Sequence, residues 1–202
     1  TDSGNVDASR VVLATGGQSL PKTGSDGFGY HLATELGHSL VECTPALDPL
    51  ILQGDFHSHL SGISHPVTLS ARSKGQKTVR MTGELLWTHF GVSGPVVLDV
   101  SRHWHRAKVE DRDVEITINF LPEHDLQKTE ARIMEFASKQ PKAQLQRALA
   151  RILPARVAGS ILSATGIDAT IQLSQLRKDV RRQLSTALLE WPINVVGGRG
   201  YK

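Results

Sequence analysis

The spacing of apolar residues changes its period part-way along this chain, and that change limits the folds the chain can adopt. Between about residues 39 and 120 apolar and polar residues alternate, most clearly over 67–71 and 114–120. A period of two predicts half-buried antiparallel strands, and the glycine, proline and serine between them favour a small barrel or sandwich. From Leu121 onward the helical period takes over. The sequence therefore predicts a mixed α+β fold, with a small antiparallel β-barrel followed by a helical bundle.

Three segments carry the helical pattern. An apolar stripe over 145–152 predicts the first helix, and Pro154 begins a second one that ends at Gly166. A third apolar face runs over 176–188 until Pro192 stops it. That last helix could close the bundle or pack between subunits, and the first of these is the simpler reading.

Both ends of the chain combine a short apolar run with glycines. Residues 10–14 read RVVLA before TGG, and residues 193–196 read INVV before GGRG. Each run predicts a buried strand, with a helix over 28–36 after the first strand and Gly37 as its stop. Because neither strand has a matching partner in the chain, we expect the β and helical blocks to be an insertion between strands of one larger sheet. The chain is then an internal fragment of a nucleotide-dependent α/β enzyme.

Charge and cysteine content exclude few classes of protein. The 23 Lys and Arg against 20 Asp and Glu give a net charge of +3, spread along the chain. The densest cluster is Arg177, Lys178, Arg181 and Arg182, which predicts a solvated helix face, with a phosphate-binding stripe as the alternative. The lone Cys43 excludes a disulfide framework and fits a reducing, cytoplasmic setting. We expect no membrane partner and no nucleic-acid partner.

The first motif with chemical content is Ala14-Thr15-Gly16-Gly17, at the end of the first apolar run. Ligands of open α/β sheets lie at such strand ends, where glycines allow the backbone to approach a nucleotide. A plain strand-to-loop turn is the alternative. The glycine-rich loop over 21–30 leads into the next helix, but its spacing matches neither phosphate-binding fingerprint, and Ser25 or Asp26 could simply cap that helix.

The second motif lies over 83–95, where an imidazole, hydroxyl groups, aromatic rings and glycines are compressed between strands. We expect a loop there, of the kind that carries function. His89 is a candidate acid or base, or a hydrogen-bond donor to a carbonyl or flavin; a structural histidine bonded to backbone is the alternative. The pairs at 57 and 59 and at 103 and 105 would each share a strand face, but we expect surface histidines and no metal site.

These segments together resemble the HI0933-like family of bacterial flavoproteins, NAD(P)/FAD-dependent oxidoreductases that include aminoacetone oxidase. The resemblance rests on VVLATGGQSLPKTGS, GYHLATELGH, TPALDPL, GELLWTHFGVSGPVVLDVS and INVVGG. It implies a Rossmann-like FAD domain interrupted by a β-barrel and a helical bundle. On that pattern the parts are a partial FAD-binding segment over 1–44, the barrel over 45–120, the helical part over 121–190 and a return strand over 191–202.

The resemblance also implies roles for particular residues. The residues implied to contact the cofactor are Ala14, Thr15, Gly16 and Gly17. The candidates for facing the substrate are Thr88, His89, Phe90, Gly91, Ser93 and Gly94. Relatives often carry an aspartate between two glycines where this chain has Phe28, with Asp26 displaced by two positions.

The implied chemistry is hydride transfer through FAD to or from a small molecule, with NAD(P)H as a possible reductant. We expect this chain alone to be inactive and free of flavin. The competing hypothesis is a stand-alone binding module for RNA, sugar or protein.

Overall fold

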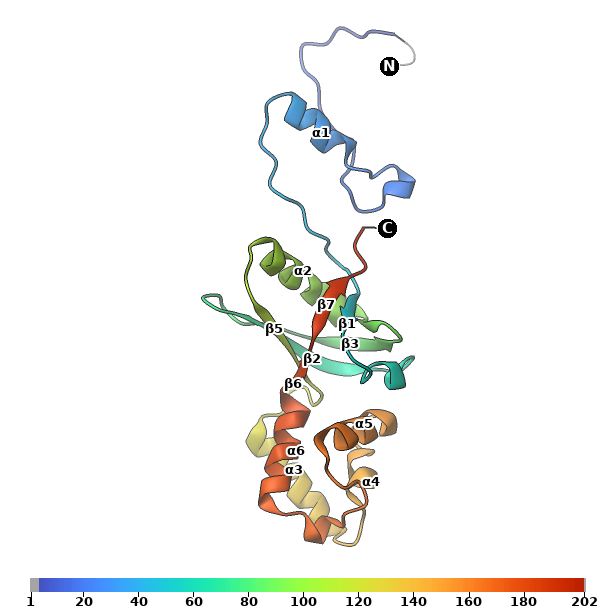
Figure 1. Ribbon diagram of the computed structural model, residues 1–202, viewed down its shortest axis with the longest axis vertical. Helices are drawn as coiled ribbons and strands as arrows, with labels where there is room; N and C mark the ends of the chain where they lie inside the picture. The colour runs from blue at the N-terminus through green and yellow to red at the C-terminus, as the bar shows by residue number, and fades with distance from the viewer. Residues whose placement is uncertain (1–3, 202) are drawn as a thin grey trace. The chain divides into compact units, whose positions relative to one another are not determined.

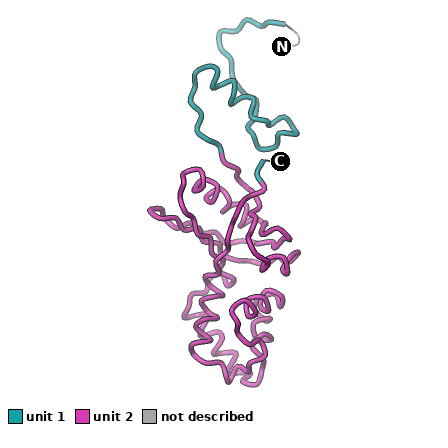
Figure 2. Tube along the Cα trace, viewed as in Figure 1, with its two compact units in different colours: residues 1–43, 200–202 teal, residues 44–199 magenta. Residues whose placement is uncertain are grey.

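The computed structural model describes residues 4–201, which divide into two compact units (Figure 2). The first unit contains the residues up to 43 and those from 200 onward, and the second contains residues 44–199. The finer four-part division expected from the sequence stays a prediction.

Among the described residues of the first unit there is one α-helix and no hydrophobic core. Helix α1 spans Phe28–Glu35, as the sequence predicts, and follows a 3-10 turn, η1, at Pro21–Thr23. Among its described residues up to Cys43 only Gly27 and Gly29 are buried, while the side chains of Phe28 and Leu36 are 62% and 64% exposed. A unit that buries almost no apolar surface lacks the main contribution to stability.

The strand predicted over residues 10–14 does not form. These residues have no regular secondary structure, and Val11 and Val12 are 78% and 86% exposed. A strand forms hydrogen bonds only with neighbouring strands, and none of the described residues pairs with this segment. The apolar run alone was therefore not sufficient.

The second unit is built on a seven-stranded antiparallel sheet in the order β6-β5-β2-β3-β4-β1-β7. The strands are β1 Leu50–Leu52, β2 Ser64–Ser73, β3 Val79–Thr88, β4 Gly91–Ser93, β5 Val114–Asn119, β6 Trp191–Ile193 and β7 Val195–Gly198 (Figure 1). The predicted apolar positions of β2 and β5 are buried, but the polar residues Ser70 and Thr117 between them are buried as well, so burial does not strictly alternate. The sheet is curved but its ladder is not closed, because its edge strands β6 and β7 do not pair with each other.

The segment predicted as one strand over 193–196 is two short strands on opposite edges of this sheet. Trp191–Ile193 pairs with β5, and Val195–Gly198 pairs with β1. Asn194 separates them and bonds through its side chain to that of Gln53 at 2.6 Å. The sequence suggested a partner outside the chain because the strands that pair with this segment lie far away in sequence.

A helix, α2, occupies Pro95–Val109, inside the block that the sequence predicts to be all strand. Gly94 precedes it and Pro95 takes its first position, where the absent N–H costs nothing. Its buried residues Val97, Val100 and Trp104 recur at helical spacing, and the helix packs against β2 and β3. The prediction was wrong here because the alternation seen elsewhere in the block was extended across these residues.

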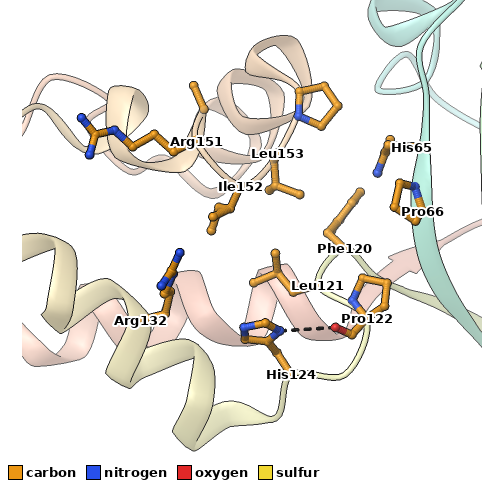
Figure 3. A pocket seen from close by; sticks show the side chains of 12 residues that line it. His65, Pro66, Phe120, Leu121, Pro122, His124, Arg132, Arg151, Ile152 and Leu153 are labelled. Atoms are coloured by element: carbon orange, nitrogen blue, oxygen red, sulfur yellow. Dashed lines mark hydrogen bonds between the residues drawn. The ribbon is translucent and has the colours of Figure 1, made fainter.

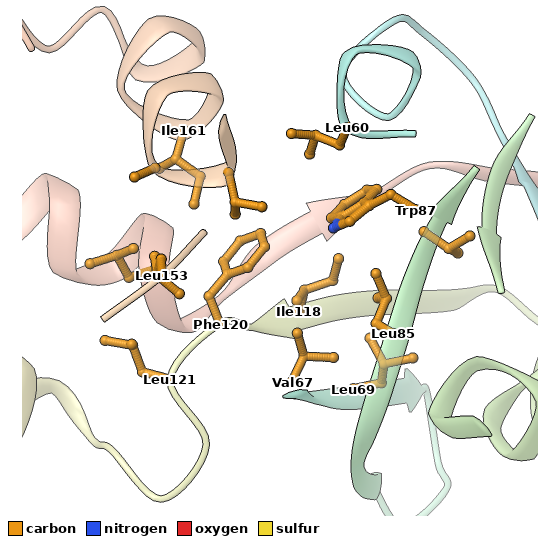
Figure 4. Close-up of a cluster of buried hydrophobic side chains, with 14 of the residues drawn as sticks. Leu60, Val67, Leu69, Leu85, Trp87, Ile118, Phe120, Leu121, Leu153 and Ile161 are labelled. Carbon is orange, nitrogen blue, oxygen red and sulfur yellow. The ribbon is translucent and has the colours of Figure 1, made fainter. Parts of the chain in front are cut away.

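Four further helices form the helical part: α3 Leu126–Lys139, α4 Leu145–Leu149, α5 Ala155–Thr165 and α6 Lys178–Leu189, with short 3-10 turns η2 Ser58–Leu60 and η3 Leu173–Gln175. The predicted start of α5 at Pro154 and its end at Gly166, in the left-handed region, are confirmed. Phe120, Leu153 and Ile161 join the sheet core around Trp87 to the helices in one buried cluster (Figure 4). The helices and sheet therefore share a single core.

Candidate functional site

The predicted cofactor segment, Ala14 to Gly17, lies against the start of α1 within the first unit. The Gly17 carbonyl oxygen accepts a hydrogen bond from the Gly27 N–H at 3.1 Å. Gly16 has φ +80°, a conformation that favours glycine, and a side chain on Gly29 would collide with that of Thr15. The pattern of glycines therefore reflects the close approach of this loop to the helix.

This segment fits one side of a nucleotide site and does not fit a phosphate cradle. Ala14, Thr15 and Gly16 are exposed, so their backbone is accessible to a ligand. At the start of α1, however, the Phe28 N–H already donates to the Asp26 carboxylate at 2.9 Å. That carboxylate repels a phosphate at the helix terminus, the usual place for one. The N-cap of α1 is Gly27 without a side-chain cap bond, so neither Ser25 nor Asp26 caps the helix, and Asp26 accepts the Phe28 N–H from one position before the cap.

The segment over 83–95 is not the loop that the sequence predicts. Its first half belongs to β3, a tight turn follows at His89 and Phe90, β4 begins at Gly91, and α2 begins at Pro95. Side chains added at Gly91 or Gly94 would run into the backbones of β1 and β3 respectively. These two glycines are therefore explained by packing, and a role in binding stays a prediction for them.

The turn at His89 and Phe90 presents an exposed imidazole. His89 stacks edge-on against Phe90, with ring centroids 5.1 Å apart, and makes no hydrogen bond with any described residue. The Arg199 guanidinium lies 4.8 Å from the centroid of the Phe90 ring. Thr88 Oγ1 is buried without a hydrogen-bond partner among the described residues. The structure thus offers an accessible proton carrier at His89, whose catalytic role stays a prediction.

A buried Asp48–His105 pair was missed by the sequence analysis. His105 Nε2 lies 2.8 Å from Asp48 Oδ2, and the other carboxylate oxygen accepts from the Arg199 N–H at 3.0 Å. The Asp48 N–H in turn donates to Ser101 Oγ at 3.0 Å. A side chain at Gly198 would collide with both members of the pair. This network joins the end of β7 to β1 and α2. The sequence did not predict the pair because its two members lie 57 residues apart.

The other expected histidine positions also need correction. His103 and His105 lie on α2, where a spacing of two points side chains to different sides, whereas His57 precedes η2 and His59 lies within it. His57 is 5% exposed, so the prediction of surface histidines was wrong for it and for His105. No group of three metal-binding side chains occurs within residues 4–201.

A hollow of about 620 Å³ lies where the sheet meets the helical part. Leu121 and Ile152 point into it, and Arg132 lies at its edge (Figure 3). At its sheet end the Trp87 Nε1–H donates to His65 Nε2 at 3.2 Å. Burial lowers the pKa of His65, which keeps the ring neutral and its Nε2 an acceptor. This hollow is apolar inside and basic at its rim.

The family comparison follows the boundary seen in the structure. The family model for the HI0933-like protein barrel and H2TH domain matches residues 44–202, and the second compact unit begins at residue 44. This chain belongs to the HI0933-like family. The predicted resemblance is therefore confirmed, and the family's barrel corresponds to the curved sheet described above.

Curated relatives of this HI0933-like chain have two kinds of name. A 3-dehydro-bile acid delta(4,6)-reductase from Clostridium scindens is 31% identical over 170 residues, covering 84% of this chain and 42% of the relative. Ribosomal RNA dihydrouridine synthases from Haemophilus influenzae and Escherichia coli are each 30% identical, covering 95% and 98% of this chain and 45% and 46% of the relatives. The chain thus spans less than half the length of these proteins.

The relatives bear on the expectation about nucleic acid, and the helices bear on the expectation about membranes. The rRNA enzymes among the relatives count against the expectation that nucleic acid is not a partner. As for membranes, no helix among residues 4–201 has the length and apolar character needed to span one.

Proposed function

We propose that this chain is the barrel-and-helix part of an FAD-dependent oxidoreductase, together with an adjoining piece of its FAD-binding domain. The observation that carries the proposal is the first unit: an exposed glycine loop at 14–17 packs on α1, yet the unit has no core. Exposed apolar side chains at Val11, Val12, Phe28 and Leu36 need cover from further polypeptide. The length of the relatives leaves room for it.

The residues Ala14, Thr15, Gly16 and Gly17 would hold one side of the FAD through their backbone. Bound FAD supplies hydride transfer, and the protein supplies position and electrostatics. The pyrophosphate needs a different cradle, because Asp26 already occupies the start of α1. The chain on its own is therefore expected to be inactive and free of flavin.

The second unit would provide the substrate side, and His89 is its candidate proton carrier. The names of the relatives describe a reductase and a synthase of dihydrouridine, and adding two hydrogens to a double bond requires a proton as well as a hydride. The imidazole of His89 is exposed, and histidine is a common general acid or base in enzymes. NAD(P)H as the reductant and a cytoplasmic setting belong to the same proposal.

Two substrate classes are open to this site, a small molecule and RNA. The bile-acid reductase supports the first, and the two rRNA enzymes support the second. The rim of the hollow between sheet and helices carries the guanidinium groups of Arg132 and Arg151, which favours an anionic substrate, and RNA is the more highly charged of the two.

Visible absorption spectra test the flavin proposal in two samples. The first is the chain mixed with FAD and then desalted, which should retain no flavin. The second is a chimera in which this chain replaces the matching segment of the E. coli relative, which should hold one flavin per chain. Flavin retained by the chain alone would contradict an incomplete site, and a folded chimera without flavin would contradict the flavoprotein proposal.

A pair of substitutions in the chimera locates the cofactor contact. Ala14→Phe adds a ring at the proposed contact and should weaken FAD binding by about tenfold or more, equivalent to about 1.4 kcal/mol. Val6→Phe, at a residue 81% exposed in the same unit, should leave FAD affinity unchanged. Equal affinity of both variants would remove Ala14 from the site.

A further inference from the structure

We infer that a basic groove on the helical part binds the phosphate backbone of RNA through Lys142, Arg147 and Arg151. The inference rests on the second substrate class proposed above, and it assigns that substrate a surface. The three side chains lie on or beside α4. This surface differs from the basic face of α6 that the sequence singled out.

Two neighbouring hollows form the groove. The apolar hollow of about 620 Å³ has Arg132 and Arg151 at its rim, and a second hollow of about 380 Å³ is lined by Lys142, Arg147 and Arg151. Arg151 belongs to both, so the cations follow one continuous path. The length of that path suits an extended polyanion better than a single small anion.

Carboxylates are absent from the described lining of both hollows. The second hollow has instead the amide side chains of Gln140, Gln144 and Gln172, which can donate hydrogen bonds to phosphate or ribose. By contrast, a polar hollow of about 520 Å³ on the sheet contains Glu123, Asp125 and Glu190. No carboxylate among the described lining residues of these two hollows therefore pairs with Lys142, Arg147 or Arg151.

The charged groups of these three residues are not engaged in polar contacts within the described fold. Lys142, Arg147 and Arg151 are exposed, and none of their side chains makes a hydrogen bond or ion pair with any residue among 4–201. Arg132 differs, since it pairs with Glu135 at 3.0 Å and lies over the Phe136 ring. Free cations release their counterions on binding a polyanion, which is the main source of affinity for nucleic acid.

The basic face of α6 serves as the matched control. There Arg177 is paired with Asp179 at 2.6 Å, and Arg182 lines a hollow that also contains Asp179 and Glu190. These carboxylates lower the local potential and compete with phosphate for the guanidinium groups. Because Arg177 is paired and Arg182 shares its hollow with two carboxylates, this face is expected to hold a polyanion less tightly than the groove does.

The test measures binding of the whole chain to a fluorescently labelled RNA hairpin by anisotropy, across a series of salt concentrations. The groove variant carries K142Q, R147Q and R151Q, and the control carries R177Q, K178Q and R182Q, which removes the same number of charges. We expect the groove variant to raise Kd at least about tenfold at about 0.1 M salt and to reduce the salt slope by about 2 to 3. The control should bind within about twofold of the unchanged chain.

Two results would overturn the inference: unchanged binding by the groove variant, or an equal loss in the control. Poly-glutamate is added as a competitor, and displacement of RNA by it at equal charge concentration would also overturn it in favour of an acidic protein partner. Tryptophan fluorescence of each variant checks that it is folded. All the substituted residues are exposed and lie outside the core, so the variants are expected to fold. The assay contains no flavin, so its failure is separable from failure of the flavoprotein proposal.

Discussion

Gly94 is the position where the close packing of the turn region can be tested most sharply. It precedes α2 with φ 93° and ψ 164°, a backbone region open almost only to glycine. An added Cβ would lie 2.7 Å from the Glu84 carbonyl oxygen and 2.8 Å from the Leu86 nitrogen, both backbone atoms that cannot move aside. Backbone strain costs about 1 to 3 kcal/mol and overpacking a similar amount, so Gly94→Ala should destabilise the second unit by about 2 to 6 kcal/mol.

Urea unfolding followed by tryptophan fluorescence measures that loss, because all three tryptophans of the chain, Trp87, Trp104 and Trp191, lie in the second unit. The control is Gly75→Ala, where φ is +76° but nothing lies within 4 Å of the added atom. It should cost only about 1 to 2 kcal/mol, from strain alone. Equal losses in the two variants would refute the packing explanation of Gly94.

The remaining predictions concern buried polar groups of the second unit. Asp48→Ala leaves the His105 ring and the Arg199 N–H without their acceptor and should cost about 3 to 5 kcal/mol in urea unfolding. Asp99→Ala, at an exposed position of α2, the helix that carries His105, should cost under about 0.5 kcal/mol, and similar losses in the two variants would contradict the network. Burial lowers the pKa of His65 in the folded chain, so the unfolded chain binds more protons below the ordinary value of 6.5 and stability should fall as pH drops through that value. His65→Gln should flatten this dependence, since Gln can still accept from Trp87, and an unchanged pH profile would argue against the neutral buried ring.

Local patterns predicted the elements whose neighbours impose a simple period. Strands β2 and β5 were recognisable because their apolar residues alternate in sequence, although Ser70 and Thr117 on the other face are buried too. Helix α5 carries its own start and stop signals at Pro154 and Gly166. Helix α2 was missed because its stripe of valines also suits a strand. The segment over 10–14 reads as a strand, but secondary structure of that kind depends on partners that a local pattern cannot reveal.

The site was less predictable than the fold, for a physical reason. Asp48 and His105 are in contact only because the sheet brings β1 and α2 together, so no local spacing in the sequence predicts the pair. The charge cluster on α6 was visible in the sequence, but the pairing of Arg177 with Asp179 was not, and the cations beside α4 are too dispersed along the chain to stand out. Paired and unpaired charge are distinguished by contacts, which the sequence does not show.

Hydrogen exchange measured by mass spectrometry tests most directly the claim that a folded barrel-and-helix unit carries a piece of a larger cofactor domain. In the isolated chain the amides of α1 should exchange at nearly unfolded rates, while those of α2 and the sheet stay protected. In the chimera with the E. coli relative, α1 should become protected as well. Amides of α1 that exchange as slowly as those of α2 in the isolated chain would show that the first unit is complete, and would contradict the claim.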